Sequence, residues 1–235
     1  PLKTGFAFLP VAFVIGVVSQ INAKLMPRLG PKPLMITGTT LLTLALFWFS
    51  TVDKGSSYAG KLLPGMFVLA VAMGCLFVPL TVTAVSNVAN TDAGLASALL
   101  NVGQQVGGAL GLSVMTTVFG TAAKNWSADH VQGLLAQVPN KADIGAVGQF
   151  LQQHGQNAEP KDIQAFVQAH PSTGSFFAQG GPFNEFVRSL LAHASGEGFL
   201  MGAIIGVVAV IAAVVLINVK KTDLPTDSPE AVAVG

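Results

Sequence analysis

Charged residues are scarce in this sequence. Lys and Arg together number 12 and Asp and Glu 11 among 235 residues, so 10% of the chain is charged while 51% is hydrophobic. A soluble globular domain has about 25% charged residues, and the mean hydropathy here is +0.61. This deficit of charge argues against an ordinary soluble domain, so a membrane protein is the first hypothesis.

Cysteine is almost absent as well, and the motifs of soluble enzymes are missing. Cys75 is the single cysteine, which excludes an intrachain disulfide, and its place in an apolar run suits a small packing residue. The histidines are scattered without the short spacing of a metal site. They are His130, His154, His170 and His193. Because the sequence also contains no Walker loop, no His-Glu-x-x-His and no glycine-rich dinucleotide fingerprint, we expect no enzyme, no cofactor and no bound metal.

Long charge-free runs are what the sequence has instead. Five gaps between consecutive charged residues are each long enough for the ~20 residues that a helix needs to cross a bilayer. The runs are continuous rather than alternating, which favours helices over barrel strands. We expect membrane-spanning helices at about 5–24, 34–52, 62–88, 93–119 and 198–219.

The distribution of basic residues predicts the orientation of these spans. Five lie between the first two spans or directly after the last: Lys24, Arg28, Lys32, Lys220 and Lys221. Three lie in the short segments on the opposite side: Lys3, Lys54 and Lys61. The positive-inside rule then assigns the C-terminus to the cytoplasm, in a multi-pass protein of the cell membrane. Because an odd number of spans separates the two ends and the chain starts at Pro1, we expect it to be the C-terminal part of a longer protein.

The segment 120–197 is polar and differs from the runs around it. It holds all the histidines and many Gln and Asn residues, and the parity of the spans places it outside the cytoplasm. Helical periodicity at Pro160–Ala169 and after Pro182 predicts amphipathic helices. We interpret the segment as a partly helical extracytoplasmic loop, either a cap packed on itself or at the membrane surface, or a lid over a substrate exit. Residues 220–235 are expected to form a disordered cytoplasmic tail.

The run 93–119 combines side-chain amides with regularly spaced glycines. The amides are Asn101, Gln104 and Gln105. Glycines recur every four residues, a small-xxx-small pattern that favours the close approach of another helix, at Gly103, Gly107 and Gly111. The amides and Gly108 fall on a neighbouring arc of the helix. Two interpretations stay open: the amides form interhelical hydrogen bonds, or they line a substrate path.

Three stretches of the chain, taken in their order along the sequence, resemble motifs of a known protein family. They are LKTGFAFLP from Leu2 to Pro10, FVPLT from Phe77 to Thr81, and DAGLASALLNVGQQVGGALG from Asp92 to Gly111. In this order they resemble the C-terminal half of a major facilitator superfamily transporter, most of all the fourteen-span drug:proton antiporters of the EmrB/QacA type. The long loop before the last span also suits that branch.

The resemblance implies an all-α membrane protein in which these five spans form most of the C-terminal bundle of a major facilitator fold. It implies a substrate cavity lined by Asn101, Gln104, Gln105, Phe77 and Thr81. From the spacing of the glycines and the missing N–H of proline, we expect helix packing or bending at Pro79, Gly103, Gly107, Gly108 and Gly111. A cytoplasmic link between the first two spans keeps Arg28, Gly30 and Lys32 of the family's motif. Pro27 stands where that motif has an acid, so the link is expected to act as a positive anchor and tight turn rather than a carboxylate latch.

The function implied is a secondary active transporter, a proton-coupled multidrug or organic-solute efflux antiporter that works by alternating access. Its partners would be the lipid bilayer, a small amphipathic organic substrate, and protons bound outside this chain, since none of the five spans contains a residue that changes charge. No nucleic-acid partner is expected. The alternative is a membrane-anchored sensor or binding module that acts through the extracytoplasmic loop.

Overall fold

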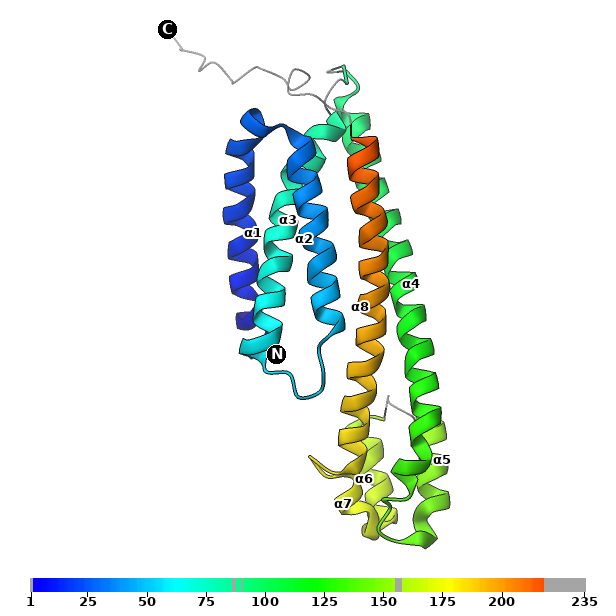
Figure 1. Ribbon diagram of the computed structural model, residues 1–235. Helices are drawn as coiled ribbons and strands as arrows, with labels where there is room; N and C mark the ends of the chain where they lie inside the picture. Colours follow the sequence, from blue (N-terminus) through cyan, green and yellow to red (C-terminus); the bar gives the residue numbers. More distant parts are fainter. Residues whose placement is uncertain (1, 86–87, 90, 155–157, 218–235) are drawn as a thin grey trace. The chain divides into compact units, whose positions relative to one another are not determined.

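The computed structural model describes residues 2–85, 88–89, 91–154 and 158–217, and within them the backbone forms helices and turns without a strand (Figure 1). The five long helices are α1 (Leu2–Leu29), α2 (Pro31–Ser50), α3 (Leu63–Val85), α4 (Ala93–Leu135) and α8 (Pro182–Leu216). Each contains a stretch long and apolar enough to cross a membrane, which confirms the predicted all-α membrane fold. The predicted tail, 220–235, lies outside the described residues.

The shorter elements are a π-helical turn, η1 (Tyr58–Leu62), two 3-10 turns, η2 (Lys141–Asp143) and η4 (Pro171–Thr173), and the helices α5 (Ile144–His154), α6 (Pro160–Ala169) and α7 (Gly174–Phe177). The chain divides into two compact units. The spanning unit comprises Pro1–Thr51, Ser56–Met115 and Phe199–Gly235, and the loop unit comprises Val52–Gly55 and Thr116–Gly198. The helices α4 and α8 are therefore each divided between the two units, with one part in the spanning unit and one part in the loop unit.

In the spanning unit, α3 lies between α1 and α2 (Figure 1). The turn from α1 to α2 consists of Gly30, whose φ of 81° lies in the left-handed region that favours glycine. The Gly30 N–H donates to the carbonyl of Met26 at 2.8 Å and closes α1. Pro31 then opens α2 at a position where its missing N–H costs nothing. A single residue thus reverses the chain.

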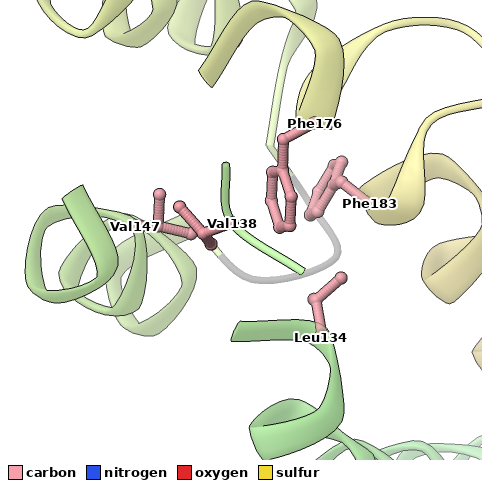
Figure 2. Close-up of a cluster of buried hydrophobic side chains, with 5 residues drawn as sticks. All are labelled: Leu134, Val138, Val147, Phe176 and Phe183. Carbon is pink, nitrogen blue, oxygen red and sulfur yellow. The ribbon is translucent and has the colours of Figure 1, made fainter. Parts of the chain in front are cut away.

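The loop unit has a hydrophobic core of its own. Five buried side chains form it: Leu134, Val138, Val147, Phe176 and Phe183. Figure 2 shows Val138 beside Val147, and the ring of Phe176 beside that of Phe183. Because these residues come from α4, α5, α7, α8 and the turn after α4, the core holds together every helix of the unit except α6, whose Ile163 and Phe166 pack against its edge.

Two helices extend further than the sequence indicated. The run expected at 93–119 belongs to a helix that continues to Leu135, and the amphipathic helix expected after Pro182 continues without a break into the last span. The 43 residues of α4 correspond to ~65 Å of helix, about twice the thickness of a hydrocarbon layer. The reason is that Lys124 marks where water becomes accessible but does not stop a helix, whereas Pro139 follows the true end.

Candidate functional site

The three predicted amides of α4 lie on an exposed helix surface. All residues from 101 to 110 are exposed, including Asn101, Gln104 and Gln105. Spacings of three and four residues put the amides on one arc of the helix. Apolar neighbours alternate with them around the helix, with Val102 56% and Val106 53% exposed. The structure therefore brings the amides together on one exposed strip of α4.

The two predicted residues of α3 form a second exposed pair. Phe77 is 62% exposed, and Thr81 lies one turn further on the same face. The hydroxyl of Thr81 donates to the carbonyl of Phe77 at 2.9 Å, so its proton is already used inside the helix. Pro79 lies between them in sequence but is fully buried, and α3 runs through it as a helix. The aromatic ring and the proline thus occupy different faces.

The predicted packing glycines of α4 have open space beside them. A Cβ atom added at Gly103, Gly107, Gly108 or Gly111 would meet no atom within 4 Å, apart from the helix's own backbone and adjoining residues. In the described residues, no other helix approaches this stripe. Its role in helix packing therefore stays a prediction.

Other glycines do bring helices together in the spanning unit. A Cβ atom on Gly74 of α3 would lie 2.7 Å from Cβ of Val18 on α1, and one on Gly38 of α2 would lie 2.7 Å from Cγ of Leu76 on α3. On α8, a Cβ atom at Gly206 would lie 2.5 Å from Oγ1 of Thr43. These close contacts were not predicted, although Gly202 and Gly206 are spaced four residues apart in the small-xxx-small pattern.

A buried amide connects α1 to α3 beside one of these glycines. Asn22 is 5% exposed, and its Nδ2 atom donates to the carbonyl of Val18 at 3.0 Å, to the carbonyl of Gly74 at 3.4 Å and toward Sγ of Cys75 at 3.3 Å. Asn22 thus plays the structural role that was one interpretation of the amides on α4. Cys75 itself is buried.

The predicted cytoplasmic link is the turn at Gly30 described above. Arg28 ends α1 in its last turn, and Lys32 lies in the first turn of α2. Both basic residues therefore flank a one-residue turn. This geometry agrees with a tight turn, while the side of the membrane on which it lies stays a prediction.

In the loop unit, Asp143 organises a polar cluster that fastens η2 to η4. Its carboxylate accepts from the hydroxyl of Ser172 and, at 3.1 Å, from Nδ2 of Asn140, and it lies 3.3 Å from Nδ1 of His170. The hydrogen bond from Ser172 is the main cause of a lowered pKa of Asp143, with His170 adding to it. Ser172 is bonded to the carboxylate rather than to the imidazole, so this is not the arrangement of an activated serine.

The other histidines mostly stack on aromatic rings. Trp126 lies 4.1 Å from His130 and 5.1 Å from Phe186 between ring centroids, and His154 stacks on Phe150 at 4.6 Å. Within the described ranges, no group of three or more His, Cys, Asp or Glu residues could hold a metal ion.

Comparison with known proteins finds a family match for the part of the chain that contains α1, α2, α3 and the first part of α4. Residues 1–112 match the model of the Major Facilitator Superfamily. This part of the chain is therefore similar to that family. All the residues predicted for the substrate cavity, helix packing and the cytoplasmic link fall inside the matched segment.

Proteins similar to this chain have names connected with drug resistance and export. The puromycin resistance protein pur8 of Streptomyces alboniger is 39% identical over 134 residues, 55% of this chain and 26% of that protein. The cephamycin export protein CmcT of Amycolatopsis lactamdurans is 33% identical over 128 residues, 54% of this chain and 26% of that protein. The tetracenomycin C resistance and export protein of Streptomyces glaucescens is 26% identical over 231 residues, 98% of this chain. The chain thus spans about a quarter to two fifths of the length of these relatives.

Proposed function

We propose that this chain is the C-terminal part of a secondary active transporter that exports drugs or similar amphipathic organic solutes. The observation that supports this most is the exposed strip of Asn101, Gln104 and Gln105 on α4, an apolar helix of the major facilitator segment. Neutral amides donate and accept hydrogen bonds at little desolvation cost compared with charges. Such a strip suits solutes of varied structure, and the names of the relatives agree with export.

In this proposal, Phe77 of α3 supplies an aromatic surface for the apolar part of the solute. Its ring is 62% exposed and so is available to a bound molecule. Aromatic and apolar side chains with a few placed polar groups are the usual lining of small-molecule sites. Alternating access would then present this site to either side of the cell membrane in turn, with the C-terminus of the chain in the cytoplasm.

Proton coupling belongs to the same proposal. It needs an ionisable group within the membrane, and the apolar parts of α4 and α8 do not supply one. The described part of α4 from Ala93 to Phe119 and the described part of α8 after Glu197 contain no Asp, Glu, Lys or Arg. A coupling residue must change its charge within the membrane. We therefore propose that the coupling carboxylate lies in the part of the transporter that corresponds to the rest of the relatives' length.

Substitution of the amides tests the proposal in the whole transporter that contains this chain. Gln104→Ala and Gln105→Ala are expected to lower efflux of at least some solutes tenfold and to change the substrate profile. Gln20→Ala, which removes an exposed amide from α1, is the matched control and should leave efflux within twofold. Efflux and profile unchanged in both variants would contradict a substrate-binding role, and the amides would then be interhelical hydrogen-bond partners.

A further inference from the structure

A cavity of about 440 Å³ lies inside the loop unit, between α4, α5 and α8. It follows one side of α4 from Gly120 to Leu135, and apolar side chains of all three helices line it, including Val131, Leu151 and Phe186. Small-molecule sites in proteins have volumes of roughly 300–1,000 Å³ and a mainly apolar lining. The cavity thus has the size and surface of a site for a small organic molecule.

The lining of this cavity carries a single positive charge. Lys124 is the single charged residue among those that line it, and neither Asp nor Glu contributes. Within the described residues Lys124 forms no salt bridge. Gln132, Gln152 and Ser127 add neutral hydrogen-bonding groups to the lining. An anion next to apolar surface gains from the lysine charge, whereas a cation of the same shape is repelled.

We propose that the loop-unit cavity binds a water-soluble amphipathic anion, with its apolar body against Val131, Leu151 and Phe186 and its anionic group near Lys124. This goes beyond the proposed export function and does not depend on it, because binding at this site requires no transport.

The neighbouring groove on α4 has the opposite sign and shows that the preference is local. Its lining includes Asp129, Glu197 and His193 together with Trp126. Two carboxylates there disfavour an anion. An amphipathic anion that binds the loop unit is therefore expected at the Lys124 side, and the effects of substitutions should distinguish the two.

The glycines of the loop unit offer a way to fill the cavity without a clash. Gly148 of α5 lines it, and a Cβ atom added there would meet nothing within 4 Å. Gly145 lies one turn earlier on the same helix, is equally open, and does not line the cavity. Gly148→Leu and Gly145→Leu thus make the same chemical change in the same helix, one inside the cavity and one outside.

The test measures binding of two probes of matched shape, 4-butylbenzoate and 4-butylbenzylammonium, to the whole chain in nanodiscs of neutral phosphatidylcholine. Equilibrium dialysis against empty nanodiscs removes the contribution of the lipid. The benzoate is expected to bind the unaltered chain at least tenfold more tightly than the ammonium probe. Gly148→Leu should weaken benzoate binding at least tenfold, and Gly145→Leu should change it less than twofold.

Lys124→Gln completes the test because it removes the charge and leaves the cavity open. It should bring the benzoate affinity down to that of the ammonium probe, while Lys141→Gln, an exposed lysine outside the cavity, should have no effect. Circular dichroism on each variant verifies that the helices are retained. Equal binding of the two probes to the unaltered chain, or benzoate binding that survives both Gly148→Leu and Lys124→Gln, would overturn the proposal.

Discussion

The two units of this chain hold their helices together in opposite ways. In the spanning unit, helices pack closely against glycines that leave no room for a Cβ atom, at Gly38, Gly74 and Gly206. In the loop unit the contacts are made by large rings, with Phe176 and Phe183 fully or almost fully buried. The physical reason is the solvent. Lipid gives little hydrophobic drive for helices to associate, so close backbone approach matters, whereas water drives the burial of aromatic surface.

The largest difference between the units is expected when a phenylalanine is replaced by alanine in each of them. Phe176→Ala removes a ring with 0% exposure from the loop unit and should lower the free energy of unfolding by about 3–5 kcal/mol. Phe13→Ala removes a ring that is 73% exposed on α1 and should have an effect below about 1 kcal/mol. Thermal unfolding in nanodiscs measures both. Similar losses in the two variants would contradict the greater dependence of the loop unit on buried rings.

The converse substitution adds a side chain where the spanning unit has none. Gly74→Leu would force a Cβ atom to 2.7 Å from Cβ of Val18 and 3.1 Å from the carbonyl oxygen of Ile15, and overpacking of this kind costs about 1–3 kcal/mol or more. Gly16→Leu on α1, with nothing within 4 Å, is the control. Denaturation in mixed micelles should separate the two variants. A stable Gly74→Leu protein would refute the close-approach role.

A smaller effect is expected from the amide between α1 and α3. Asn22→Leu keeps the approximate volume but removes the donor to the carbonyl of Gly74, and membrane hydrogen bonds of this kind are worth about 1 kcal/mol. The matched change Gln20→Leu replaces an exposed amide of the same helix and should cost nothing measurable. The same micelle denaturation resolves the difference, and equal stability of the two variants would leave Asn22 without a structural role.

The smallest effect concerns the pH dependence of the loop unit. The folded pKa of Asp143 lies below its ordinary value of 3.8, mainly because Ser172 donates to the carboxylate. The resulting stabilisation is fully present above pH 3.8 and is lost as the pH falls through the lower, folded pKa. Near-UV circular dichroism between about pH 2 and pH 5 should follow this loss. Asp143→Asn should abolish that part of the acid transition, and Asp129→Asn should retain it.

Much of the fold could be predicted because a helix that crosses a membrane must be apolar over about 20 residues, and such runs are visible in the sequence. Gaps between charges such as Lys32 and Asp53 indicate the spans directly, since a charged group is costly in the hydrocarbon layer. The extent of α4 could not be obtained in this way. Lys124 ends the apolar run, but the helix ends only at Leu135, because backbone hydrogen bonds continue equally well in water.

The candidate site shows where a single sequence stops being informative. Regular spacing pointed to Gly103 and Gly107, whose packing role stays a prediction, and it did not point to Gly74, where the structure shows a close contact. A glycine is a packing residue only if a partner helix faces it, and the identity of the partner is a property of the three-dimensional arrangement. The amides on α4 and the buried amide of Asn22 likewise differ in their surroundings rather than in their chemistry.

The stack of Trp126 on His130 has a consequence for spectroscopy. The chain has two tryptophans, of which Trp48 belongs to α2 in the spanning unit and Trp126 to the loop unit. A Trp48→Phe protein would therefore emit indole fluorescence from the loop unit alone. With the imidazole of His130 at 4.1 Å and the ring of Phe186 at 5.1 Å, that emission would respond to any rearrangement of the rings, so the loop unit contains its own optical reporter.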